Sequence, residues 1–142
     1  MRLMALDIGD KRIGLATTDE LGVAIWPQPT WIRKNLSGDV KGILEKIRDH
    51  SIETLVVGLP LNMDGTEGPQ AKKVKDFVSS LSLEMQRKGI AVPVEWCDER
   101  LTSWEAEKLL TERGLKGAER KAQVDALAAC LILEDYLERK RT

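Results

Sequence analysis

The sequence predicts an α/β protein with a mixed five-stranded sheet, an antiparallel meander followed by parallel strands, flanked by helices. The chain opens with two short, branched apolar runs, 3–8 and 12–17, separated by Gly9-Asp10-Lys11, which is typical of a β-hairpin. Later strand-length runs alternate with segments of helical apolar spacing, which favours parallel strands. With 142 residues and no repeat or linker, residues 1–142 are expected to form a single domain.

The meander is expected to continue with a third strand over residues 22–26. Pro27 and Pro29 should end it, because proline cannot donate to a sheet ladder, and residues 31–33 would extend it beyond that irregularity. The following run, 54–60, is continuously apolar, as expected for an interior strand covered on both faces.

Helix and strand then alternate, with caps and glycines marking the ends of the helices. Ser37 or Asp39 can cap the first helix, Pro69 suits a first helical turn, and Thr102 with Glu105 forms a capping box. Four helices are predicted: from Ser37 or Asp39 to His50, from Pro69 to about Lys88, from Thr102 to near Gly114, and over 122–139. A strand over 92–97 lies between the second and third helices, and a basic connector over 116–121 lies between the third and fourth.

Composition is that of a soluble globular protein, with 42% hydrophobic and 32% charged residues. No apolar run approaches the ~18 residues that span a bilayer, so we expect a cytoplasmic protein without a membrane partner. The net charge of −1 provides no overall attraction to nucleic acid. A nucleic-acid partner would therefore need a local basic patch.

Asp7 places a carboxylate at the end of the first predicted strand. By strand alternation it shares a face with Leu3 and Ala5, where an unpaired buried carboxylate would cost several kcal/mol. A bound cation would compensate that cost. The alternative is a strand-end aspartate that caps a turn.

Two more acidic sites occupy comparable places: Asp98-Glu99 at the end of a later strand, and Asp125 in the expected first turn of the last helix. If the two strands are parallel neighbours and the helix crosses their ends, three carboxylates converge. Such a group suits Mg²⁺ or Mn²⁺, and two ions about 4 Å apart could support phosphodiester hydrolysis. Glu99 is favoured over Asp98, because it shares a face with Cys97 if Trp96 points into the core.

Each acid also has a structural interpretation. Asp125 could interact with its own helix dipole, and Asp98-Glu99 with Arg100 could form a solvated turn with an ion pair. Ala126, together with the neighbouring Ala128 and Ala129, favours the catalytic interpretation, because small residues let the helix approach the strand ends closely.

Four segments in order resemble the YqgF family of Holliday-junction-resolvase-like proteins, bacterial nucleases that process the precursor of 16S ribosomal RNA. The segments are 6–16 (LDIGDKRIGLA), 56–66 (VVGLPLNMDGT), 98–102 (DERLT) and 124–126 (VDA). The resemblance covers the whole chain. It implies an RNase H-like fold and a divalent-metal-dependent nuclease that hydrolyses ester bonds in ribosome biogenesis.

The resemblance further implies that Asp7, the Asp98-Glu99 acid and Asp125 are the catalytic, metal-binding carboxylates, with Mg²⁺ or Mn²⁺ as cofactor. Nearby basic side chains and one amide could contact nucleic acid, which the resemblance implies is precursor ribosomal RNA, on its own or in a ribosomal subunit. These candidates are Lys11, Arg12, Asn62 and Arg100. The structural alternatives are solvated turns or ion pairs for the basic residues, and a tight connection for the loop that contains Asn62.

Three other functions are compatible with parts of this pattern. A resolvase of four-way DNA junctions would use the same carboxylates but would need a dimer, whereas we expect a monomer or weak homodimer. A non-catalytic factor of transcription or ribosome assembly could hold metal without hydrolysis. The Asp-x-Gly hairpin also opens actin- and sugar-kinase-type folds, which need two such lobes.

Overall fold

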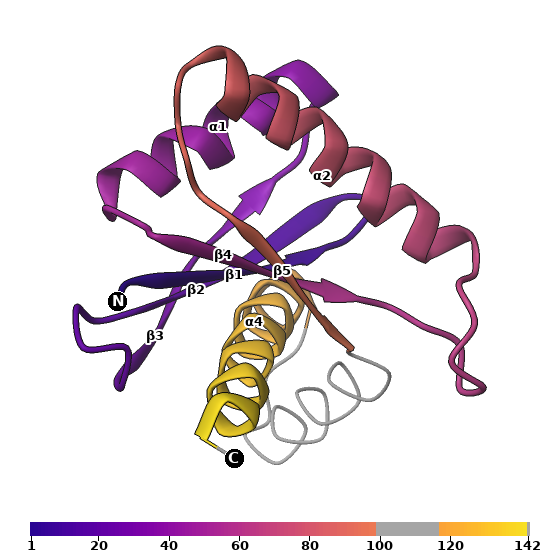
Figure 1. The fold of residues 1–142 in the computed structure, drawn as a ribbon. Coiled ribbons are helices and arrows are strands. Elements are labelled where there is room, and N and C mark those ends of the chain that lie inside the picture. The colour runs from indigo at the N-terminus through magenta and orange to yellow at the C-terminus, as the bar shows by residue number, and fades with distance from the viewer. Residues whose placement is uncertain (99–116, 142) are drawn as a thin grey trace.

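The computed structural model describes residues 1–98 and 117–141, and the predicted helix that begins at Thr102 lies outside this part. Figure 1 shows the described elements around one twisted sheet. In chain order they are β1 (Leu3–Ile8), β2 (Arg12–Thr18), β3 (Ile25–Ile32), α1 (Leu36–Asp49), β4 (Thr54–Leu59), α2 (Pro69–Arg87), β5 (Val94–Asp98) and α4 (Gly117–Arg141).

The sheet has the strand order β3-β2-β1-β4-β5. β1 pairs antiparallel with β2, and β2 with β3, while β4 runs parallel to both β1 and β5. This arrangement confirms the predicted mixed five-stranded sheet, with its meander first and its parallel strands second. It also brings the ends of β1 and β5 to the same edge of the sheet, on either side of β4.

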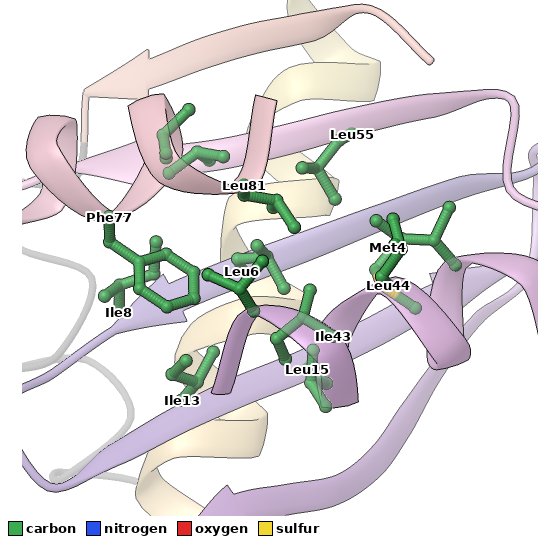
Figure 2. Close-up of a cluster of buried hydrophobic side chains, with 14 of the residues drawn as sticks. Met4, Leu6, Ile8, Ile13, Leu15, Ile43, Leu44, Leu55, Phe77 and Leu81 are labelled. Carbon is green, nitrogen blue, oxygen red and sulfur yellow. The ribbon is translucent and has the colours of Figure 1, made fainter. Parts of the chain in front are cut away.

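Helices cover both faces of the sheet: α1 and α2 lie on one side and α4 on the other (Figure 1). The larger core lies beneath α1 and α2, where Figure 2 shows side chains of β1 and β2 meeting those of both helices. Its fully buried members include Met4, Leu6, Ile13, Leu15, Ile43, Leu55 and Leu81.

A smaller core lies between the sheet and α4. Leu3 and Ala5 of β1 belong to it, whereas Met4 and Leu6 belong to the larger core, as strand alternation requires. The other members include Ala16, Val56, Cys97, Ala129, Ile132 and Leu133. β1 and β4 are buried on both faces, which explains why their apolar residues run continuously and do not alternate with polar ones.

The third strand differs from the prediction. β3 starts at Ile25 rather than at Gly22 and runs through both Pro27 and Pro29 to Ile32. It lies at the edge of the described sheet, and its pairing with β2 shifts register between Ile13 and Leu15. An edge strand can accommodate proline because the missing N–H need not serve a second neighbour.

α1 begins at Leu36, one turn earlier than a cap at Asp39 would allow. The N-cap is Asn35, whose side chain accepts a hydrogen bond from the backbone N–H of Gly38 at 2.8 Å. The prediction of Ser37 or Asp39 as the cap was therefore wrong. Asp39 is instead buried, and its carboxylate accepts hydrogen bonds from Trp31 Nε1, Arg33 Nε and the backbone N–H of Lys34, each at 3.0 Å.

The last helix is also longer than predicted. α4 begins at Gly117 rather than at residue 122, so the predicted basic connector is helical from residue 117 onward. Ala, Glu, Arg and Lys are good helix formers, so the high charge of this segment was not evidence for a loop.

None of the helices in the described ranges is long and apolar enough to cross a membrane.

Candidate active site

Asp7 is the penultimate residue of β1 and lies directly opposite Gly14 of β2. Alternation along β1 places it on the α4 face, together with Leu3 and Ala5 of the smaller core. The position of Asp7 at the strand end, on a face shared with buried apolar residues, is as predicted.

Gly14 allows α4 to approach the sheet at this point. A Cβ on Gly14 would lie 2.0 Å from the backbone oxygen of Asp125, so the helix backbone rests against the strand where any side chain would intervene. Because Gly14 is the cross-strand partner of Asp7, Asp7 and Asp125 lie at neighbouring positions on one face. Sequence analysis missed Gly14, although a glycine inside a strand pattern signals a close backbone approach.

Asp125 is the ninth residue of α4, so it lies two turns into the helix and not in its first turn. This overturns the interpretation that Asp125 interacts with the dipole at its own helix N-terminus. The carboxylate is largely buried, with 17% of the side chain exposed, and its Oδ2 accepts a hydrogen bond from Arg12 Nε at 2.7 Å. Burial raises the pKa of Asp125 above its ordinary value, and the Arg12 guanidinium only partly offsets that rise.

Arg12 was predicted either to contact phosphate or to form a structural ion pair. In the structure its guanidinium pairs with Asp125. Arg12 lies on the same strand as Gly14 and faces α4 by alternation. β2 therefore supplies both the glycine against which α4 packs and the cation that balances the charge of Asp125.

Asp98 ends β5 opposite Leu59 and was one of two candidates for the third acid. Cys97 is buried against α4, so alternation directs Asp98 to the opposite face, away from Asp7. Trp96 does not point into the core as supposed, because 41% of it is exposed beside α2. Glu99 and Arg100 lie outside the described residues.

The two described carboxylates fit a divalent cation by their chemistry. Both supply oxygen ligands, which Mg²⁺ and Mn²⁺ prefer, and the largely buried Asp125 charge is balanced by one guanidinium contact. Within residues 1–98 and 117–141, no three His, Cys, Asp or Glu side chains gather closely enough to hold a metal. A full ligand set would therefore need a further donor, and the predicted Glu99 falls in the segment between these ranges.

The two other predicted nucleic-acid contacts are exposed. Lys11 lies in the β1–β2 turn, and Asn62 lies in the loop after β4. The Asn62 amide donates to Thr66 Oγ1 at 3.0 Å, and its backbone N–H donates to the carbonyl of Thr66 at 2.9 Å. Gly65, with a φ of +88°, completes this tight turn. The side chain of Asn62 thus already holds the loop together.

Comparison with solved structures shows the fold. Thermus thermophilus RuvC aligns with a TM-score of 0.60 at 16% identity, covering 99% of this chain and 97% of that one. T. thermophilus RuvC in complex with a Holliday junction substrate aligns with a TM-score of 0.58 at 18% identity, covering 98% and 96%. The RNase H-like fold implied by the sequence resemblance is thereby confirmed.

Comparison with curated relatives shows the family. Proteins of Anaeromyxobacter sp. (strain K) and Desulforudis audaxviator, both described as "Putative pre-16S rRNA nuclease", are each 44% identical to this chain. The alignments cover 99% and 100% of this chain and 98% and 97% of the relatives. The family model described as "RuvX: Holliday junction resolvase" matches residues 1–139. The chain therefore belongs to the RuvX family, the resolvase-like family that its four motifs indicated under the name YqgF.

Proposed function

We propose that this protein is a divalent-metal-dependent nuclease that hydrolyses phosphodiester bonds in the 16S rRNA precursor, at its 5′ end. The observation that supports the proposal is the contact of the α4 backbone at Asp125 with Gly14, the cross-strand partner of Asp7, which puts the two acids at neighbouring positions on one face. Membership of the RuvX family and the names of the 44% identical relatives support both the reaction and the substrate.

The proposed roles of the acids follow from their positions. Asp7 and Asp125 would hold Mg²⁺ or Mn²⁺, and we propose Glu99 as the third ligand because alternation directs Asp98 away from Asp7. When bound, the cations would lower the pKa of an attacking water and neutralise the departing 3′ oxygen.

The basic residues have a separate proposed role. The Arg12 guanidinium neutralises Asp125 in the structure, and it would be free to contact a phosphate if a cation took over that neutralisation. Lys11 and Arg100 would contact phosphates further along the strand. For Asn62 we propose an indirect contribution, since its amide keeps the loop in one shape.

We also propose a cellular location, an oligomeric state and a partner for this nuclease. Residues 1–142 would act as one nuclease domain in the bacterial cytoplasm, as a monomer or weak homodimer that meets its RNA on the ribosomal subunit. A Holliday junction resolvase remains the second candidate, because that is the description of the family. It would require a stable dimer with two symmetric sites.

A cleavage assay tests the proposal. Labelled 16S rRNA precursor, an unrelated single-stranded RNA and a four-way DNA junction are incubated with Mg²⁺, Mn²⁺ or EDTA, using wild type, Asp7→Asn and Asp49→Asn. Asp49, the exposed last residue of α1, serves as a matched carboxylate control. We expect metal-dependent cleavage of the precursor that falls at least ~10³-fold in Asp7→Asn and is unchanged in Asp49→Asn.

Two results would replace the proposal. Preferential cutting of the junction, with a dimer in gel filtration, would establish the resolvase. Tight RNA binding without cleavage in any metal would establish a non-catalytic factor whose carboxylates hold metal for structure.

A further inference from the structure

A hollow of about 690 Å³ lies on the side of the sheet opposite α4. Three segments line it: the β1–β2 turn with Asp10 and Lys11, residues 32–39 from the end of β3 into the first turn of α1, and the middle of α2. None of the roles proposed above for the catalytic acids uses this hollow. We call it the β3–α1 groove.

Arg33 forms the fixed floor of the groove and ties it to the catalytic hairpin. Its Nη1 donates to the carbonyl of Gly9 at 2.8 Å and its backbone N–H to the carbonyl of Lys11 at 2.9 Å. Its Nε donates to the buried Asp39, and its guanidinium lies 5.0 Å from the centre of the Phe77 ring. The groove is therefore joined rigidly to the turn that begins two residues after Asp7.

The rim of the groove combines cations with exposed apolar surface. Four basic side chains face three acidic ones in the lining, although the whole chain carries a net charge of −1. Two of these acids are already paired, Asp39 with Arg33 at 3.0 Å and Asp10 with Lys73 at 3.4 Å. Lys11 and Lys34 are exposed, and neither forms an ion pair within the described part of the chain.

The apolar part of the rim consists of Ile32 and Leu36, which are 59% and 49% exposed. They lie on either side of Lys34 in the chain, so ammonium and apolar surfaces alternate. Phosphates next to uncovered bases or riboses match this alternation, whereas a duplex keeps its base faces stacked inside.

We propose that the β3–α1 groove binds the unpaired nucleic-acid strand that flanks the scissile phosphate. Lys11 and Lys34 would contact its phosphates, and Ile32 and Leu36 would contact a base or ribose. Lys11 is the fourth residue after Asp7, at most about 14 Å along the chain, so a strand that passes from Asp7 over the β1–β2 turn would reach the groove within a few nucleotides. This inference rests on the proposed nuclease function and extends its site beyond the carboxylates.

Binding in EDTA tests the groove independently of cleavage. The Kd of a labelled single-stranded RNA and of the same sequence as a blunt duplex is measured by fluorescence anisotropy over a series of salt concentrations. The variants are Lys34→Gln, Ile32→Ser and the control Lys88→Gln, at the exposed end of α2 outside the groove. Circular dichroism verifies that each variant is folded.

We expect wild type to prefer the single strand. Lys34→Gln should weaken that binding several-fold and reduce the slope of log K against log salt by about 0.7, the value for one lost phosphate contact on a single strand. Ile32→Ser should weaken it about threefold with the slope unchanged, because it removes apolar contact only. Lys88→Gln should bind as wild type does.

The inference is overturned if Lys34→Gln and Ile32→Ser bind the single strand as tightly as Lys88→Gln does. It is also overturned if wild type binds the duplex as tightly as the single strand and both variants leave the Kd for the duplex unchanged. Those results, combined with Asp7-dependent cleavage, would reject the groove and leave the nuclease proposal intact. The predicted binding differences without any cleavage would retain the groove only as a single-strand binding site and reject the nuclease proposal.

Discussion

At the scale of single residues, the Arg12–Asp125 contact decides the electrostatics of the site. One nitrogen, Arg12 Nε, donates to one oxygen, Asp125 Oδ2, at 2.7 Å, and both side chains are largely covered by the protein. A guanidinium in this place offsets the negative charge that a metal would otherwise neutralise.

Replacing Arg12 by Gln should lower the free energy of unfolding in EDTA by about 2 kcal/mol, because a largely buried carboxylate loses its charge-assisted donor. Mg²⁺ should restore most of this loss, since a cation then neutralises Asp125. Urea denaturation with and without Mg²⁺ measures both effects. Arg12→Lys, which keeps the charge, should lose less, and a loss that is the same with and without Mg²⁺ would argue against metal at Asp125.

The raised pKa of Asp125 predicts that the stability contributed by this group falls as pH rises, whereas a carboxylate with a lowered pKa contributes stability that grows as pH rises. Burial favours the protonated form in the folded state, so this group contributes stability at low pH and loses it as pH rises through its folded pKa. Asp125→Asn should therefore match wild type near pH 3 and become the more stable protein as pH approaches 7. Melting temperatures in EDTA across this range provide the measurement.

Asp39 is a second buried carboxylate, and its pKa is shifted in the opposite direction to that of Asp125. Burial alone would raise its pKa, but hydrogen bonds from Trp31, Lys34 and Arg33 outweigh burial and lower it below 3.8. The stability from Asp39 is thus present above pH 3.8 and declines as pH falls through the lower folded pKa. Asp39→Asn should be the less stable protein at pH 7, with the difference shrinking in acid. The same sign for both variants would contradict this assignment.

At the scale of elements, the site depends on how closely α4 packs on β2. Gly14 has no Cβ, and the helix backbone at Asp125 occupies the space a Cβ would need. The neighbouring Ala128 and Ala129 are fully buried, so small side chains maintain the close packing along the helix. The placement of Asp125 beside the strand position opposite Asp7 is thereby determined by backbone contact and not by long side chains.

Gly14→Ala should destabilise the protein by about 3 kcal/mol, because the added methyl group overlaps backbone that cannot rotate away. It should also reduce cleavage more than substrate binding, because Asp125 moves away from Asp7. Thermal unfolding and separate values of kcat and KM test the two effects. Gly38→Ala is the control, since its Cβ would meet only the Asn35 side chain at 3.2 Å. Equal stability of the two variants would exclude the close-packing role.

At the scale of the whole molecule, metal binding and folding are linked. Asp7 and Asp125 come to one face only when β1, β2 and α4 are assembled, so a cation bound by both would stabilise the folded state. At a Mg²⁺ concentration a hundred times its Kd, the gain should be about 2.7 kcal/mol. Differential scanning calorimetry should show this gain in wild type and its absence in Asp7→Asn. A similar gain in both proteins would place the cation elsewhere.

Much of this architecture was predictable from local patterns. Strand and helix periods identified the β1–β2 hairpin, the interior strand β4 and the helix that begins at Pro69. Asp7 stood out because a carboxylate at that position contradicts the apolar pattern around it. Four short motifs in order identified the family, which the match over residues 1–139 confirmed. All these features depend on neighbours within a few residues.

Only the tertiary structure decided the features that depend on contacts between distant segments. β3 tolerates Pro27 and Pro29 because it lies at the edge of the described sheet, and a proline signal cannot reveal which strand is the edge. The pairing of Arg12 with Asp125 joins residues 113 positions apart. The sequence by itself thus determined the sheet, the family and the candidate acids. Packing determined that Asp125 lies beside the strand position opposite Asp7, because that placement depends on a helix resting against a single glycine.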